Sequence, residues 1–451
     1  MIDREFWRGF FPLLLSFAAA QATQQVDAAM LTRLGDGTVA AYVVLTRIAL
    51  PDTVLMIALG SVASVFVSQA KRESLPVGPV IGRVIIAALV AGTLTGIIGL
   101  FGYARAASWM VDDPRIAALV GRAVPWFALG SPLRFAASTA VFVLIAVGEG
   151  VPVTRWRLAE IAAKAGANSL LIFQFGLGFA GSFAAGALVH AAALTVYAVL
   201  LRPHLSGAAV WPTREWASAF APKVAWETQR VLAMAGFALA GVALFSTSWF
   251  WPADPKRLDA YAAGMVMTLF VFAPLVALVR FLAFRLAGRP ADEIIALVQS
   301  LRRYGVAVGT GAGVLLFLSA ASIGRAVYGQ SGPWWSLLVA ALALSLPLRI
   351  AANVTRGALQ SRNEFATVAF IDTVTSWGLG FPLIGLGLFL NSPIVAYAYL
   401  VVPELLCLAW LHRRLRASLR RPPVPAAAST RTGDPEKTQE PVSADRQPRA
   451  A

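Results

Sequence analysis

Residues 79–104 read PVIGRVIIAALVAGTLTGIIGLFGYA, and Arg83 is the one charged side chain among them. A helix needs about 20 mostly apolar residues to cross the hydrocarbon core of a bilayer. This run is longer than that, and lipid solvates an apolar helix surface that water would not tolerate. The stretch therefore predicts a transmembrane helix.

Stretches of similar character lie on both sides of this run. They cover residues 9–32, 39–69, 119–146, 154–177, 180–201, 226–250, 259–287, 303–327, 334–357, 364–388 and 393–415. Pro51, Pro125, Pro132, Pro274 and Pro347 lie within or near these stretches and predict bends, because proline removes a helical hydrogen bond. Together with 79–104, these stretches predict an all-α membrane protein with twelve transmembrane helices.

The composition of the 451-residue chain agrees with a membrane protein. Hydrophobic residues make up 58% of it and charged residues only 14%, against about 25% in soluble chains. A net charge of +15 would suggest nucleic acid in a soluble protein, but these basic residues lie in loops and in the C-terminal tail. We therefore expect contact with anionic membrane lipid and no nucleic-acid partner.

Loop charge predicts the orientation. Basic residues gather on one side, in the loops that follow the even-numbered spans: Lys71, Arg72, Arg83, Arg155, Arg157, Arg202, Arg214, Lys223, Arg285, Arg289, Arg302, Arg303, Arg356, Arg362, Arg413, Arg414, Arg416, Arg420 and Arg421. The opposite loops are poorer in basic residues or balance them with aspartates. The positive-inside rule then places both termini in the cytoplasm, and we expect a bacterial inner membrane.

The chain looks doubled at an offset of about two hundred residues. Ala40-Ala41-Tyr42 begins the second span and Asp259-Ala260-Tyr261 the eighth, and Gly-rich polar turns end the fourth and tenth spans. This pattern predicts two six-helix lobes related by a pseudo-twofold axis along the membrane normal. The predicted divisions are an N-lobe (1–201), a cytoplasmic linker (202–225), a C-lobe (226–418) and a disordered tail (419–451).

Several short motifs resemble those of the multidrug and toxic compound extrusion (MATE) family. They are VDAAMLTRLG at 26–35, GEGVP at 148–152, NSLLIF at 168–173, GLGFAG at 176–181 and RGALQ at 356–360, followed by Trp377 and Pro382. Their order on a twelve-span layout extends the resemblance over about residues 9–415.

The resemblance implies a V-shaped secondary transporter of the multidrug/oligosaccharidyl-lipid/polysaccharide flippase superfamily. Such a protein exports amphipathic, often cationic, organic compounds in exchange for protons or sodium ions. We expect no cofactor, no enzymatic activity and a monomer, since the sequence has no Walker loop and its three histidines lack metal-like spacing.

Asp27 is the strongest candidate for proton coupling. A carboxylate within a span is costly, so it persists where it faces a cavity or a partner, and it could load and release a proton there. Gln24 lies near the same helical face, and Asn168 matches the family position whose amide lies near this aspartate. The alternatives are a structural aspartate bonded to neighbouring helices and an amide that only packs helices.

The sequence departs from the family pattern in both lobes. Ile172 stands where proton-coupled members carry a second carboxylate, and Arg349 lies in the region where sodium-coupled members place an acid. A fixed guanidinium repels a sodium ion, so we expect proton rather than sodium coupling. Arg349 could pair with Glu227 or with another acid; Glu227 either matches the family's acidic residue in the seventh span or lies at the cytoplasmic interface.

Two further expectations concern helix contacts. Glu160 and Lys164 are four residues apart and predict an ion pair on one helix. Glycines between Gly309 and Gly313 predict close helix packing.

Two other functions remain open at the level of sequence. A lipid-linked saccharide flippase would use basic residues in the cavity, for which the candidates are Arg47, Arg134, Arg280 and Arg349. A non-transporting scaffold is the other alternative, and the missing second carboxylate favours it.

Overall fold

A computed structural model describes residues 4–35, 37–205, 211–247, 251 and 255–420. The described residues form helices and turns without strands. They make twelve long helical segments in the predicted order, so the twelve-helix prediction is confirmed. The predicted tail falls outside the described residues from position 421 onward.

Six segments make the N-lobe. They are α1 (Arg4–Leu31), α2 (Thr38–Ile48) with α3 (Leu50–Arg72), α4 (Val77–Met110), α5 (Pro114–Val147), α6 (Gly150–Asn168) with the π-turn η2 (Ser169–Gln174), and α7 (Gly178–Leu201). Pro51 lies in the first turn of α3, and the helix of the second span is interrupted at Ala49, between α2 and α3. The predicted bend in the second span is therefore present.

Six more segments make the C-lobe. They are α8 (Arg214–Ser246), α9 (Pro255–Leu286), α10 (Ala291–Ile323) with η4 (Gly324–Tyr328), α11 (Pro333–Ser361), α12 (Phe365–Thr375) with η5 (Ser376–Gly380) and α13 (Phe381–Phe389), and α14 (Pro393–Tyr397) with η6 (Ala398–Leu400) and α15 (Val402–Leu419).

Ten of the twelve segments are long and apolar enough to cross a membrane by length and composition. The other two are α1 and α6 with η2, which pack against each other in the N-lobe. Each carries polar side chains in its last turns, among them Asp27 and Lys164. The two segments that do not meet this criterion are thus the ones whose side chains meet in a polar cluster.

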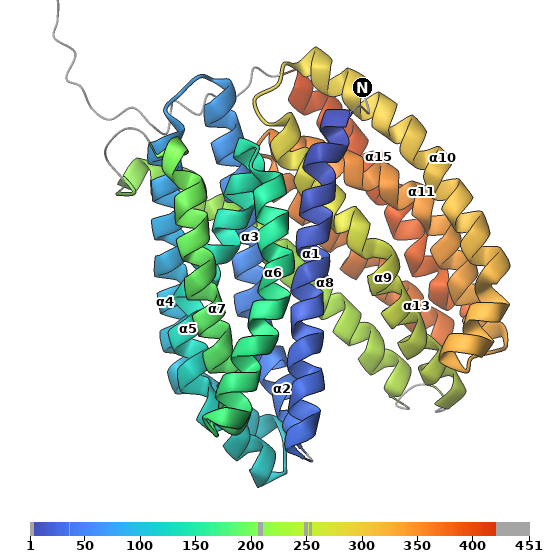
Figure 1. Cartoon of the computed structure of the whole chain (residues 1–451). Coiled ribbons are helices and arrows are strands. Elements are labelled where there is room, and N and C mark those ends of the chain that lie inside the picture. The colour runs from blue at the N-terminus through green and yellow to red at the C-terminus, as the bar shows by residue number, and fades with distance from the viewer. Residues whose placement is uncertain (1–3, 36, 206–210, 248–250, 252–254, 421–451) are drawn as a thin grey trace, which may run out of the picture.

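The two lobes form a V (Figure 1), with the N-lobe in blue to green and the C-lobe in light green to red. The bundles approach each other at the end where α3, α9 and α11 terminate, which is the predicted cytoplasmic end. There the Gln69 amide donates to the Ser361 carbonyl at 3.3 Å and accepts from the Asn363 amide at 3.2 Å. Arg72 donates to the Arg285 carbonyl at 3.1 Å.

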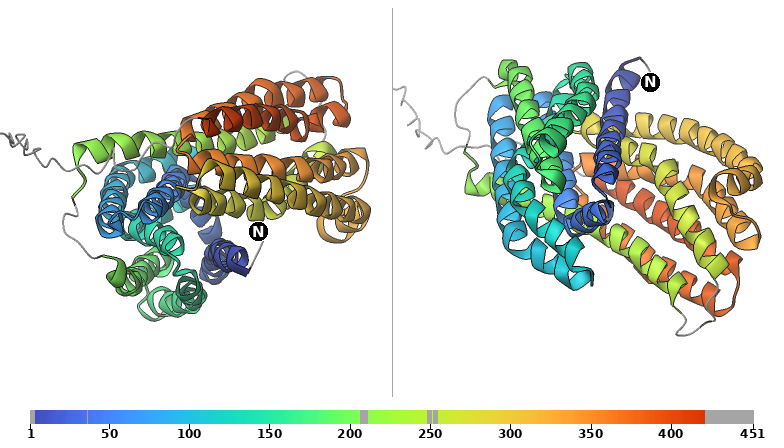
Figure 2. Two further views of the ribbon diagram at one scale, coloured as in Figure 1. Left: turned by 90° about the horizontal axis from the view of Figure 1, so that it is seen from above. Right: turned by 60° about the horizontal axis from the view of Figure 1, so that its bottom comes forward.

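The predicted linker is too long. Residues 214–225 are the first turns of α8 rather than loop, and the Thr213 hydroxyl caps this helix by accepting from the Trp216 amide. Trp216 stacks on Phe220 at 4.5 Å between ring centroids, and Phe220 meets Phe66 of α3 at 5.3 Å. This apolar face explains the early start, because it lets α8 run from beside the N-lobe into the C-lobe (Figure 2).

Candidate functional site

Asp27 lies at the centre of a buried polar cluster in the N-lobe. Its side chain comes from α1, and the residue is only 8% exposed. One carboxylate oxygen, Oδ1, accepts from the Asn168 amide at 2.8 Å and from the Ser182 hydroxyl at 3.0 Å. The same oxygen is 3.0 Å from the ammonium nitrogen of Lys164. The carboxylate therefore links α1 to α6 and α7.

Local sequence brings these donors together. Lys164 and Asn168 are one turn apart on α6, so both side chains emerge on one face. Gly176 and Gly178 have positive φ angles of 66° and 55° and turn the chain from η2 into α7. A Cβ atom on Gly181 would lie 2.8 Å from the Leu171 carbonyl oxygen, so only glycine lets α7 approach η2 this closely. This approach places Ser182 beside Asp27.

The structure brings together only part of what the sequence predicts for this site. Asn168 lies beside Asp27 as expected. Gln24 does not, because it is exposed on another face of α1 and makes no hydrogen bond within the described chain. The prediction of an ion pair between Glu160 and Lys164 is also wrong, because each side chain has another partner.

Glu160 is held by a different partner. The Arg157 guanidinium donates to it at 2.9 Å, while the Lys164 ammonium turns to Asp27 and to the Ser182 carbonyl at 2.5 Å. Lys164 therefore contacts Asp27 on α1 and Ser182 on α7 rather than Glu160 on its own helix. Lys164 and Ser182 are the two residues that sequence reasoning missed, although a lysine one turn before Asn168 is a visible signal.

Ile172 lies where the family resemblance suggested a second carboxylate. It is 2% exposed and packs in an apolar cluster with Leu31 and Leu45. The second charged group at Asp27 is therefore a cation rather than an acid. In the described part of the chain, Lys164 is the one basic side chain within ion-pair distance of Asp27.

A third N-lobe ion pair lies on α3 and α5. Arg134 is 3.6 Å from Asp52, and its guanidinium covers the Phe127 ring at 4.1 Å. Arg47 instead is exposed on α2. This pair shares no residue with the Asp27 cluster.

Glu227 belongs to a charge network in the C-lobe. It is 1% exposed, and the Arg230 guanidinium donates to both of its oxygens, at 2.6 Å and 2.9 Å. The Gln360 amide donates to it at 2.9 Å. Glu227 is buried inside the lobe, and its contact with Gln360 places it beside the last turn of α11, near the end where the two lobes meet.

Arg356 of α11 holds the middle of this network. Its guanidinium donates to Asp372 at 2.8 Å, to Glu404 at 2.9 Å and to the Cys407 sulfur at 3.1 Å. Arg230 approaches the other oxygen of Asp372 at 3.3 Å, which joins the Glu227 group to the Arg356 group.

Two further arginines border the network. Arg349 is 3.8 Å from Glu404 and covers the Phe272 ring at 4.2 Å, so its acidic partner is Glu404 and not Glu227. Arg280 is 3.9 Å from Glu227 and donates to the Ile57 carbonyl of the N-lobe at 3.2 Å. The described residues hold no group of His, Cys, Asp and Glu side chains that could bind a metal ion.

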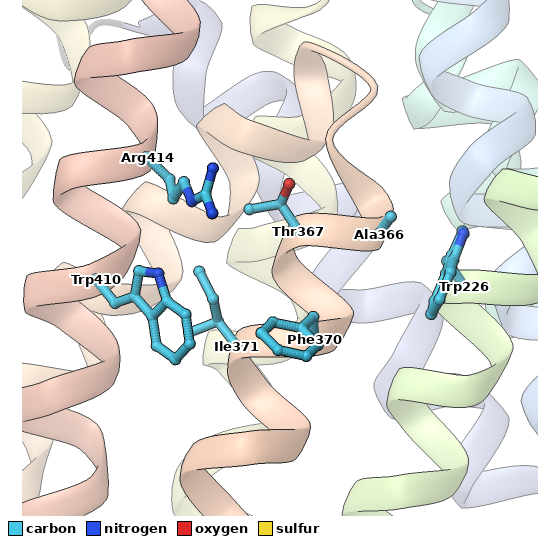
Figure 3. A pocket seen from close by; sticks show the side chains of 7 residues that line it. All are labelled: Trp226, Ala366, Thr367, Phe370, Ile371, Trp410 and Arg414. Carbon is cyan, nitrogen blue, oxygen red and sulfur yellow. The ribbon is translucent and has the colours of Figure 1, made fainter.

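A groove of about 260 Å³ lies on α8, α12 and α15 (Figure 3). Its lining residues are Trp226, Ala366, Thr367, Phe370, Ile371, Trp410 and Arg414. Phe370 is 54% exposed on the outer face of α12. Apart from Arg414 its lining is uncharged, which suits a surface that contacts lipid.

Comparison with known proteins agrees with this fold. Residues 12–157 match the MatE family model. The structure of the Vibrio cholerae MATE transporter VcmN in the bent form matches with 15% identity and a TM-score of 0.78, over 91% of this chain and 96% of that one. A MATE structure in the bent conformation matches with 13% identity and a TM-score of 0.79, over 91% and 94%. No curated protein matches the chain by sequence.

Two lobes of six helices, most of them long and apolar enough to cross a membrane, define an integral membrane protein. Its N-lobe matches the MatE family model over residues 12–157, and the whole chain has the fold of solved multidrug and toxic compound extrusion transporters. The resemblance predicted from the short motifs is thereby confirmed.

Proposed function

We propose that this protein is a secondary transporter that exports amphipathic or cationic organic compounds in exchange for protons. The observation that carries the proposal is the buried Asp27 carboxylate, which three donors from α6 and α7 hold within the N-lobe. An intramembrane carboxylate of this kind is costly and is a candidate for proton or substrate binding. A change in its charge alters contacts among three helices and can favour one conformation of the lobe.

Protons fit the charge arrangement better than sodium ions do. A bound cation of this hard type is held by several oxygen ligands, carboxylates among them. The C-lobe carboxylates Glu227, Asp372 and Glu404 all face guanidinium groups within the distances given above. Asp27 already has an ammonium beside it. A sodium ion would have to displace a fixed cation at each of these places.

The two alternative functions find less support. The flippase alternative needs free basic groups for a pyrophosphate. Of its four candidates, Arg134, Arg280 and Arg349 each face a carboxylate, at 3.6–3.9 Å, whereas Arg47 is exposed on α2. The scaffold alternative gains if Asp27, Asn168 and a hydrated cavity between the lobes do not converge; the Asn168 amide donates to Asp27 at 2.8 Å, which meets the first part of this condition. Exchange across a bacterial inner membrane, with cytoplasmic termini, is the reading that follows from the loop charges.

The test is proton-driven efflux of a fluorescent organic cation from proteoliposomes. We expect efflux by the wild type to follow an imposed pH gradient and to ignore a sodium gradient, and we expect Asp27→Asn to abolish this response because the amide cannot carry the negative charge. Asp52→Asn is the control, since Asp52 is also a buried N-lobe carboxylate in an ion pair. A wild type that moves no cation down the pH gradient would contradict the proposal.

Alternating access gives a second expectation, at the end where the lobes meet. Gln69→Ala removes two hydrogen bonds between lobes, each contributing about 0.5–1.5 kcal/mol, so the closed arrangement should weaken by about 1–3 kcal/mol. Spin labels on Ser74→Cys and Ala366→Cys should then report a larger population of long distances.

Lys71→Ala is the matched control for this experiment. Lys71 donates to the Val147 carbonyl at 2.7 Å, a contact within the N-lobe, so its removal should leave the distance distribution unchanged. Equal distributions in Gln69→Ala and wild type would show that these two bonds do not hold the lobes together.

A further inference from the structure

Lys164 is buried as deeply as the aspartate it contacts. The residue is 4% exposed, and its ammonium has two partners, Asp27 Oδ1 at 3.0 Å and the Ser182 carbonyl at 2.5 Å. The ammonium group lies in the middle of the N-lobe, close to Gly186 of α7. A lysine in such a place persists because the carboxylate balances its charge.

Charge balance limits what this pair can do. With Asp27 ionised and Lys164 protonated, the pair is neutral. Protonating Asp27 leaves a buried ammonium without a counter-charge, and removing the proton from Lys164 leaves a bare carboxylate. Either state is strongly unfavourable in a medium of low polarity. The site stays neutral if a cation arrives at Asp27 as the proton leaves Lys164.

We propose that Lys164 is the proton carrier of this transporter, and that its ammonium and an organic cation of single positive charge compete for the Asp27 carboxylate. This inference rests on the proposed function and names the group that holds the proton. In the exchange, an N–H bond of the ammonium breaks, the proton passes to water and the electron pair stays on Nζ. The organic cation then takes the place of the ammonium beside Oδ1, and the steps reverse when a proton returns.

The neutral donors around Asp27 suit such an exchange. Asn168 and Ser182 hold Oδ1 without contributing charge, so the carboxylate keeps its position whether the ammonium or another cation faces it. The Ser182 carbonyl gives the neutral amine a hydrogen-bond acceptor after the proton has left.

The other titratable and charged groups near the pair have partners of their own or lie on its far side. Glu160, one turn before Lys164 on α6, is held by Arg157, and His190 of α7 is 3.8 Å from Glu160. Arg134 of α5 pairs with Asp52. Tyr42 of α2 lies within electrostatic reach of Asp27 on the side of the aspartate. In the described chain, Lys164 is thus the group best placed to exchange a proton against Asp27.

Competition between the Lys164 ammonium and an organic cation for Asp27 is sufficient to couple proton movement to cation movement in opposite directions. The site holds a proton on Lys164 or a cation on Asp27, but not both, so the two ligands oppose each other reciprocally. The site carries one positive charge, the organic cation, when it turns outward, and one positive charge, the proton on Lys164, when it turns inward. The predicted exchange is one proton for one singly charged cation.

The test compares two substitutions of the same lysine, using the full-length protein and tetraphenylphosphonium as the probe. In the wild type, one proton should be released for each cation bound, and affinity should rise about tenfold per pH unit where the lysine stays protonated. Lys164→Arg keeps the ion pair but cannot deprotonate, so binding and proton-driven transport should be lost. Lys164→Gln leaves Asp27 without a counter-charge, so the carboxyl group takes up a proton itself and releases it when the probe binds; binding should therefore survive in this variant while it is lost in Lys164→Arg.

The outcomes separate this inference from the proposed function. Proton release on binding by Lys164→Arg, or proton-driven transport by that variant, would overturn the role of Lys164 while the transporter stands. Wild-type binding without proton release would overturn it even if neither variant folds. A wild type that moves no organic cation in response to a pH gradient would overturn the proposed function, and this inference with it.

Discussion

Replacing Arg356 by methionine is expected to destabilise the protein by about 3–5 kcal/mol, the range for removing one partner of a buried charge cluster. Asp372 and Glu404 would each lose a charged hydrogen bond shorter than 3 Å. The remaining partners are more distant, since Arg230 is 3.3 Å from Asp372 and Arg349 is 3.8 Å from Glu404. Asp372 and Glu404 would then be two buried carboxylates without enough nearby positive charge to balance them.

Thermal melting of the purified protein in detergent measures this loss. Arg289→Met is the matched control, because Arg289 also pairs with a carboxylate, Glu293 at 2.9 Å, but does so at the surface. Exposed pairs contribute about 0–1 kcal/mol, so the control should melt close to the wild type. If both variants melt alike, the Arg356 network does not stabilise the C-lobe.

The helices could be predicted from sequence because the bilayer leaves few alternatives. A run such as 79–104 must satisfy its backbone groups internally, so hydropathy alone predicts α4 (Val77–Met110), although the helix starts two residues before the run and ends six residues after it. Pro51 marks the break before α3 for an equally local reason. Both features depend only on neighbouring residues along the chain.

The start of α8 escaped prediction because hydropathy averages over a window. Residues 214–225 mix charges with Trp216, Phe220 and Val224, so their mean is low even though these apolar side chains recur every four residues. Such spacing indicates an amphipathic helix.

The partners of the charged residues depend on contacts that sequence spacing does not reveal. Glu160 and Lys164 have the spacing of a helix pair, but the ammonium reaches across to Asp27 instead. Gln24 has the spacing of a neighbour of Asp27, yet it lies on the exposed side of α1. The resemblance placed Asn168 correctly because it carries three-dimensional information from related proteins. It could not place Lys164, which is not part of the motif.

Gly313→Ala is expected to destabilise the C-lobe by about 1–3 kcal/mol, the usual cost of overpacking. Gly313 lies on α10 against α11, and a Cβ atom there would stand 2.6 Å from the Ala343 carbonyl oxygen. A backbone carbonyl cannot rotate away from the new methyl group as a flexible side chain can, so α10 and α11 would have to separate. The prediction from the Gly-rich stretch, that it allows close packing, therefore depends on this residue and on Gly309, whose Cβ would meet Pro347 at 3.0 Å.

Gly311 provides a control of opposite sign on the same helix. A Cβ at Gly311 meets no atom within 4 Å, and alanine in a helix interior is favoured over glycine by about 0.5–1 kcal/mol. Melting temperatures should therefore fall for Gly313→Ala and hold or rise for Gly311→Ala. Equal shifts in both variants would mean that backbone flexibility, and not the contact between α10 and α11, determines how this lobe tolerates a side chain. Opposite shifts would place the stabilising contact at the helix interface itself.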